Sequence, residues 1–100
     1  MNILLTGASS GLGGSLLKRL SNCSGMRIKV MVHRSLIDIA GCEPRQGDLD
    51  NPELLARAVD GVDTVVHMAA LTRSAKESEY FRVNVAGTQN LLDACILNRV

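Results

Sequence analysis

Residues 2–14 read Asn-Ile-Leu-Leu-Thr-Gly-Ala-Ser-Ser-Gly-Leu-Gly-Gly, an apolar run followed at once by a cluster of glycines. The apolar part, from Asn2 to Thr6, predicts a β-strand that ends abruptly at Gly7. Leucines at positions 12, 16, 17 and 20 then lie on one face of a helix expected over 12–20. Because the glycines join a predicted strand to a predicted helix, they have the context of a phosphate-binding turn. The sequence therefore predicts a βα unit with an anion site at its turn.

The remainder of the chain alternates in the same way between short apolar runs and helical patterns, which is typical of βαβ units around a parallel sheet. Expected strands lie over 26–33, 42–46 and 62–68, and expected helices over 51–59 and 76–97, with one helical turn over 35–41. Pro44 restricts its strand to a sheet edge or an irregular position. Since crossovers are right-handed, we expect an α/β, Rossmann-like three-layer fold, a partial parallel sheet with strand order 3-2-1-4. The outer edge of the fourth strand is then left uncovered.

The composition fits a single soluble domain over residues 1–100, with 46% hydrophobic and 21% charged residues. Eleven lysines and arginines against ten acidic residues give a net charge of +1 without a block of like charge, which argues against nucleic acid and membrane partners. No apolar run approaches the roughly 18 residues of a membrane span, and the first residues lack a secretory signal pattern. Three cysteines without a CxxC pair, and two histidines without closely spaced ligands, predict reduced thiols, a cytoplasmic location and no metal site.

Each glycine of the turn has a separate expected role. Gly7 can make the sharp turn off the strand, Gly11 lets the backbone approach a pyrophosphate, and Gly13 lets the helix lie close to the sheet. Backbone N–H groups at the start of the helix would face the phosphates. The predicted contacts are Gly7, Ser9, Ser10, Gly11, Leu12 and Gly13. No Lys-Ser or Lys-Thr pair follows, so an ATP or GTP loop is poorly supported, and the remaining alternative is a glycine-rich turn that binds nothing.

The second strand ends in Val32-His33-Arg34-Ser35, where many dinucleotide sites have a carboxylate for the adenosine ribose. Here no carboxylate is present. Arg34, with His33 beside it, could instead contact a 2′-phosphate, because a guanidinium makes strong charge-assisted hydrogen bonds to phosphate. This interpretation favours NADP over NAD as the cofactor. The alternative is a solvated arginine on the protein surface.

Four sequence pieces, in this order and spacing, resemble the extended branch of the short-chain dehydrogenase/reductase family, which contains epimerases, dehydratases and reductases. They are Thr6-Gly7…Gly11…Gly13, Gly47-Asp48-Leu49, Gly61-Val62-Asp63-Thr64-Val65-Val66-His67-Met68-Ala69-Ala70, and Asn84-Val85-Ala86-Gly87-Thr88. The resemblance covers nearly the whole chain. It implies that residues 1–100 are the NAD(P)-binding, N-terminal part of a longer enzyme that transfers hydride at an alcohol or carbonyl group.

The resemblance also implies roles for individual residues. Asp48 would accept a hydrogen bond from the adenine amino group and Leu49 would lie against the ring, although an Asp at a strand end also caps turns. At Ala69 and Ala70 the backbone would pass the ribose and phosphates of the cofactor. The alternative is that these small residues only pack closely against their neighbours. Val83 would lie near the nicotinamide end.

Four further residues have expected roles outside the cofactor contacts. The resemblance implies that His67 is a packed or hydrogen-bonded histidine and not a proton donor. Asn84 is expected to tie the long helix to the sheet. Thr72 and Ser74 could meet a small-molecule substrate in the complete protein, and a solvated loop is the alternative.

Two features depart from the family pattern. The glycine spacing is that of the family's shorter branch, and the catalytic Tyr-x-x-x-Lys is absent, since the only tyrosine, Tyr80, has Asn84 four residues later. We therefore expect a fragment that is inactive by itself. The alternatives are a non-catalytic NAD(P)H sensor and a structural module. A homo-oligomer would form through the 76–97 helix or the exposed sheet edge.

Overall fold

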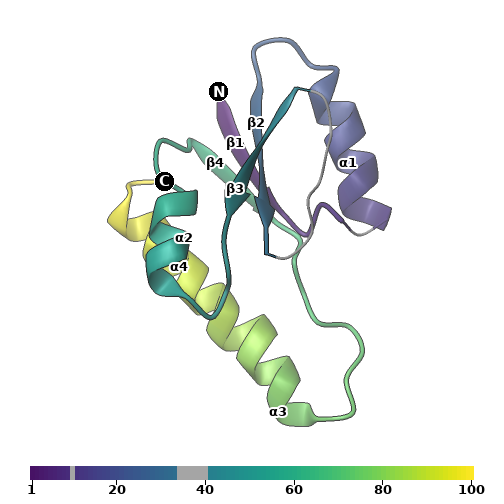
Figure 1. Cartoon of the computed structure of the whole chain (residues 1–100), viewed down its shortest axis with the longest axis vertical. Coiled ribbons are helices and arrows are strands. Elements are labelled where there is room, and N and C mark those ends of the chain that lie inside the picture. Colours follow the sequence, from purple (N-terminus) through teal and green to yellow (C-terminus); the bar gives the residue numbers. More distant parts are fainter. Residues whose placement is uncertain (10, 34–40) are drawn as a thin grey trace.

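The computed structural model describes residues 1–9, 11–33 and 41–100 (Figure 1). Four parallel strands form one sheet in the order β3-β2-β1-β4, so the predicted fold class and strand order are confirmed. The strands are β1 (Asn2–Thr6), β2 (Arg27–Val32), β3 (Cys42–Gln46) and β4 (Thr64–His67). In the register of the sheet, Leu4 of β1 lies between Lys29 of β2 and Val65 of β4.

The ends of this sheet agree with the sequence. β3 with its Pro44 is an edge strand, and among the described residues no strand lies beyond β4. β4 is shorter than the expected 62–68, because Val62 is buried in the turn that precedes it.

The helices are α1 (Gly11–Ser21), α2 (Pro52–Ala58) and one continuous run made of α3 (Glu77–Tyr80), η1 (Phe81–Ala86) and α4 (Gly87–Leu97). The expected helix over 76–97 is therefore confirmed, but its middle segment, η1, is a π-helix. Asn51 caps α2, since its side-chain oxygen accepts the N–H of Leu54 at 3.2 Å. The helical turn expected over 35–41 falls almost wholly outside the described residues.

Alternating side chains of the strands build two hydrophobic cores, one on each face of the sheet. Leu4 belongs to a core with α2 and α4, whereas Ile3 and Leu5 belong to a core with Leu17 of α1. Figure 1 shows α1 on one side of the sheet and α2 with α4 on the other. The three layers leave the carboxyl ends of the strands as the edge at which such folds bind ligands.

The turn between β1 and α1 is built from backbone in close contact. Gly7 has a φ of +77°, and a Cβ at this position would lie 2.6 Å from the amide nitrogen of Ala69. Gly13 is buried, and a Cβ there would collide with the carbonyl oxygen of Gly7 and lie 2.8 Å from the Cα of Ala8. Glycine is required at both positions, so the sharp turn expected at Gly7 is confirmed, and Gly13 lets the helix lie close to the turn that follows β1.

Candidate functional site

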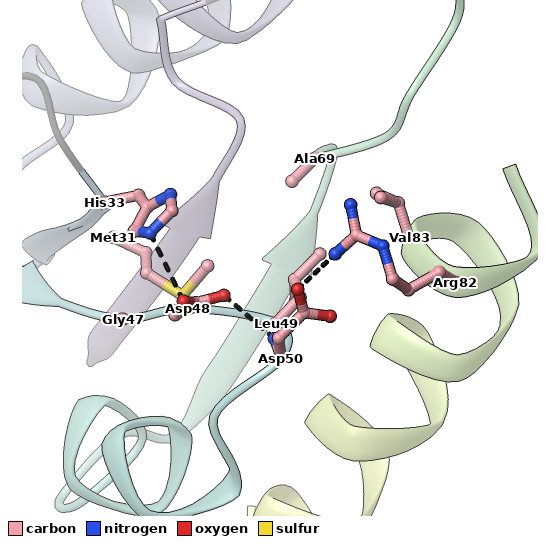
Figure 2. Close-up of a pocket in the computed structure, with 9 residues that line it drawn as sticks. All are labelled: Met31, His33, Gly47, Asp48, Leu49, Asp50, Ala69, Arg82 and Val83. Carbon is pink, nitrogen blue, oxygen red and sulfur yellow. Dashed lines mark hydrogen bonds and ion pairs between the residues drawn. The ribbon is translucent and has the colours of Figure 1, made fainter. Parts of the chain in front are cut away.

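A cavity of about 260 Å³ opens at the carboxyl ends of β2 and β3, beside the end of β4 (Figure 2). It is lined from β2 and its end by Met31 and His33, after β3 by Gly47, Asp48, Leu49 and Asp50, after β4 by Ala69, and from η1 by Arg82 and Val83. Five of these residues are candidate cofactor contacts from the sequence, namely His33, Asp48, Leu49, Ala69 and Val83. The structure therefore brings residues from four separate segments into one site.

Asp48 closes the turn after β3 and also reaches β2. Its Oδ1 accepts the N–H of Asp50 at 2.9 Å, and its Oδ2 lies 3.2 Å from Nε2 of His33. The turn-capping alternative for Asp48 is thus present in the structure. A carboxylate has about four lone-pair sites, so these two contacts leave acceptor capacity for a ligand.

Leu49 fixes the long helix against the loop that follows β3. Gly87 is buried at this contact, where an added Cβ would lie 3.0 Å from the Cβ of Leu49. The side-chain amide of Asn90 donates to the carbonyl oxygen of Leu49 at 2.8 Å. Gly87 thus lets the helix lie close to this loop, and the position of η1 beside the cavity follows from it.

Val83 lines the same cavity as Asp48 and Leu49, the two residues expected at the adenine. The reason is the docking of Gly87 on Leu49, which holds the preceding helical turn over this cavity.

Arg82 and Asp50 are cavity residues that the sequence did not indicate. The Arg82 guanidinium pairs with the Asp50 carboxylate, and it donates to Glu79 Oε2 at 2.6 Å. The pKa of Arg82 is raised, mainly by its hydrogen bond to Glu79 and next by the negative charge of Asp50. Met31 and Gly47 were also missed as cavity residues. Arg82 and Asp50 are 32 positions apart in the sequence, so no local sequence pattern could have indicated their ion pair.

The glycine turn lies beside the cavity and is not part of its lining. Ala69 connects the two, because it lines the cavity and its amide lies against Gly7. A Cβ at Gly11 would meet no atom within 4 Å, Ser9 and Leu12 are exposed, and the first turn of α1 holds no acidic residue. This turn therefore leaves open space where an anion could approach the start of α1.

The remaining candidates are Ala70, Ser10 and Arg34. Ala70 is exposed and does not line the cavity. Ser10 and Arg34 lie outside the described residues. Their expected roles stay predictions.

His67 joins β4 to β1 and to the long helix. The hydroxyl oxygen of Thr6 accepts the N–H groups of Met68 at 3.0 Å and Ala69 at 3.1 Å, so its own hydrogen is donated to Nδ1 of His67 at 2.6 Å. Nε2 of His67 then carries the ring hydrogen and donates to the Thr88 hydroxyl at 3.1 Å. The expectation of a hydrogen-bonded histidine is confirmed.

This arrangement predicts a pH dependence of stability. Burial lowers the pKa of His67 below its ordinary value, and protonated Nδ1 would face a Thr6 oxygen that already accepts two N–H groups. The unfolded chain therefore takes up the proton first, and His67 lowers the free energy of unfolding as the pH falls below about 6.5. Urea denaturation at about pH 7.5 and about pH 5.5 measures the change. His67→Gln should have a weaker pH dependence, and equal pH dependence in both proteins would contradict this assignment.

The loop after β4 is held by the long helix. Asn84 accepts the N–H of Leu71 at 2.7 Å and donates to the carbonyl oxygen of the same residue at 2.9 Å. The Tyr80 hydroxyl accepts the N–H of Ser74 at 2.7 Å and contacts the carbonyl oxygen of Thr72 at 3.4 Å. Asn84 thus ties the helix to this loop and not to the sheet, which corrects the expectation.

Within residues 1–9, 11–33 and 41–100, no three or more His, Cys, Asp or Glu residues gather as metal ligands. None of the helices in these ranges has the length and apolar character needed to cross a bilayer.

Comparison with known proteins gives consistent matches. Residues 4–100 match the model of the 3-beta hydroxysteroid dehydrogenase/isomerase family. Among curated proteins, the chain is 33% identical over 99 residues to 4-hydroxy-2-methyl-3-oxo-4-farnesyl-3,4-dihydroquinoline-1-oxide ketoreductase of Stigmatella aurantiaca, covering 94% of this chain and 29% of that protein.

Solved structures agree with this match. MoeE5 in complex with UDP-glucuronic acid and NAD superimposes with a TM-score of 0.83 at 32% identity, covering 98% of this chain and 33% of that one. UDP-N-acetylglucosamine 4-epimerase from Bacillus cereus superimposes with a TM-score of 0.81 at 33% identity, covering 100% and 32%. The chain therefore spans about a third of the length of the relatives it matches.

Proposed function

The chain belongs to the 3-beta hydroxysteroid dehydrogenase/isomerase family, within the extended short-chain dehydrogenases/reductases, and from this we propose that it binds a nicotinamide dinucleotide for a longer reductase, dehydrogenase or epimerase. The observation that carries the proposal is the cavity containing Asp48 and Leu49 beside the glycine turn. Both lie at the carboxyl edge of the parallel sheet, where doubly wound folds bind dinucleotides.

We assign the adenine half of the ligand to the cavity. The cavity has a volume of about 260 Å³, below the ~300 Å³ at which pockets for whole drug-sized ligands begin. A cavity of this size suits a nucleobase better than a complete dinucleotide. Met31, Leu49 and Val83 supply apolar surface for the ring, and Asp48 supplies an acceptor for the adenine amino group. Ala69 lies between this cavity and the glycine turn.

The diphosphate fits the turn over residues 7–13. The partial positive charge at the start of α1 and its N–H groups attract an anion. Support comes from Gly11, where an added side chain would project into open space, and from the absence of acidic residues in the first turn of α1. Ser9 is exposed at this turn, and Ser10 follows it in the sequence as a further proposed donor.

The chain's own residues supply binding and orientation for the reaction. When bound, the nicotinamide exchanges hydride with an alcohol or carbonyl group. Proton transfer is assigned to the Tyr-x-x-x-Lys motif of the family, and this sequence has no such motif, so the 100-residue chain is inactive alone. A downstream Tyr-x-x-x-Lys in the complete protein would support the enzyme, and its absence would support a non-catalytic sensor.

The three unpaired thiols support a cytoplasmic location.

Titration of NADPH and NADH into the purified chain tests the proposal. The fluorescence of the reduced nicotinamide reports binding, and ADP-ribose competes if the adenosine and diphosphate carry the affinity. Folded protein that binds neither nucleotide at millimolar concentration would exclude the proposed function. Saturable binding that ADP-ribose reverses would support it.

NADP preference is a separate prediction, carried by Arg34. If its guanidinium pairs with the 2′-phosphate, Arg34→Ala should weaken NADPH binding by about tenfold, the cost of one charge-assisted hydrogen bond, and leave NADH unchanged. Arg27→Ala is the control: it removes an exposed arginine at the amino end of β2 and should change neither affinity. Equal loss for both nucleotides in Arg34→Ala would refute the 2′-phosphate assignment.

A further inference from the structure

Arg82 reaches the cavity because the helix that carries it is locally a π-helix. The N–H of Gly87 donates to the carbonyl oxygen of Arg82, five residues earlier, so one turn closes on the fifth residue and not the fourth. In an α-helix, two residues five positions apart point about 140° away from each other. In this π-helical turn, Arg82 and Val83 lie five and four residues before Gly87. Both nevertheless line the cavity beside the contact of Gly87 with Leu49. Single π-helical turns in otherwise α-helical runs are frequent at functional sites.

The position of the guanidinium is held from several sides. Asp50 pairs with it (Figure 2), and Glu79 accepts from its other terminal nitrogen at 2.6 Å. Asp50 is itself held by its N–H, which donates to Asp48 at 2.9 Å. The flat guanidinium is thereby kept in one place beside the apolar surface of Val83 and Leu49.

This ion pair has little to contribute to the stability of the fold. The side chains of Arg82 and Asp50 are each 48% exposed, and ion pairs in such settings contribute little to stability. Arg82 is half exposed and lines the cavity, so a ligand in the cavity can contact its guanidinium. An ordered, planar cation at the rim of a base-sized cavity is suited to stack on an aromatic base.

We propose that Arg82 is an adenine-contacting residue, placed by the π-helical turn and held by Asp50 so that its guanidinium stacks on the face of the ring. Asp50 is a positioning residue in this arrangement, since it acts through Arg82. The inference depends on the proposed dinucleotide function and adds a contact that the glycine turn and Asp48 do not supply.

The test separates the two halves of the ligand. Binding of 5′-AMP, NMNH and NADH is measured for the wild-type chain and for Arg82→Met, which keeps an apolar stem and removes the planar cation. We expect about tenfold weaker binding of 5′-AMP and NADH and unchanged binding of NMNH. Arg82→Lys should lose nearly as much, because an ammonium group keeps the charge but not the plane. Asp50→Asn should produce a smaller loss with the same selectivity for 5′-AMP over NMNH.

Glu77→Gln is the matched control, since it removes an exposed carboxylate of α3 that does not line the cavity, whereas the carboxylates that pair with Arg82 are those of Asp50 and Glu79. It should change 5′-AMP binding less than twofold. Thermal denaturation verifies that each variant is folded, and Arg82→Lys serves as the second variant if Arg82→Met is not. If the wild-type chain binds NADH and 5′-AMP but the folded Arg82 variants bind them equally well, the stacking role is wrong. If the wild-type chain binds none of these nucleotides, the proposed function itself has failed.

Discussion

Gly13→Ala is expected to lower the free energy of unfolding by about 3 kcal/mol, the upper range for forcing one extra group into a packed interior. The new Cβ would overlap the carbonyl oxygen of Gly7 and lie 2.8 Å from the Cα of Ala8. Both atoms are backbone, so relief requires the β1–α1 turn to move. The helix preference of Ala over Gly, about 1 kcal/mol, acts in the opposite direction and is too small to compensate. A loss of this size is a large part of the stability of a 100-residue domain.

Gly14→Ala is the matched control for this measurement. It lies one position further along α1, and a Cβ there would be 3.7 Å from the carbonyl oxygen of Ala8, an ordinary contact. The control should therefore be as stable as the wild-type chain or more stable by up to about 1 kcal/mol. Urea denaturation of the three proteins gives the comparison. If Gly13→Ala is as stable as Gly14→Ala, the close packing of α1 against the turn is not as described.

Gly11→Asp is expected to separate binding from stability. A Cβ at this position would meet no atom of the described residues within 4 Å, and a carboxylate in the first turn of a helix is favourable by about 0.3–1 kcal/mol. The fold should therefore be unaffected or slightly more stable. The same carboxylate would occupy and repel the place of the diphosphate, so we expect affinity for NADH to fall at least a hundredfold, or about 2.7 kcal/mol.

The control for this prediction is Ser15→Asp, which adds the same charge at an exposed position one helical turn further along α1. Charge effects at helix ends fall off within the first turn, so NADH affinity should change little. Fluorescence titration measures binding, and thermal denaturation measures stability. A folded Gly11→Asp variant that binds NADH as the wild-type chain does would show that the diphosphate lies elsewhere.

Several features were predictable because their causes are local in the sequence. The apolar run of β1, the leucine spacing of α1 and the Asn51-Pro52 start of α2 each act through neighbouring residues. Strand order followed from the handedness of crossovers, which holds for nearly all parallel sheets. The need for glycine at Gly7 and Gly13 was predictable for the same reason, since the turn between a strand and a helix leaves little space for side chains.

Other features of the site have long-range causes. The π-helical turn depends on how Gly87 seats against Leu49, and the pair of Arg82 with Asp50 exists only after this docking. The helix pattern over 76–97 contains no sign of it, since the same residues satisfy an α-helix. The contact between His33 and Asp48 likewise requires β2 and β3 to be adjacent.

Hydrophobic periodicity and backbone sterics act between near neighbours, so the amino-acid sequence was enough to predict the strands, their order in the sheet, the positions of the helices and the glycine turn. The set of side chains around the cavity, in contrast, depends on tertiary packing. Val83 lies with Asp48, and Arg82 reaches Asp50, because one helix packs on one loop at a single register. Residues far apart in the sequence come into contact only through tertiary packing. The spacing of residues in the sequence does not predict these contacts.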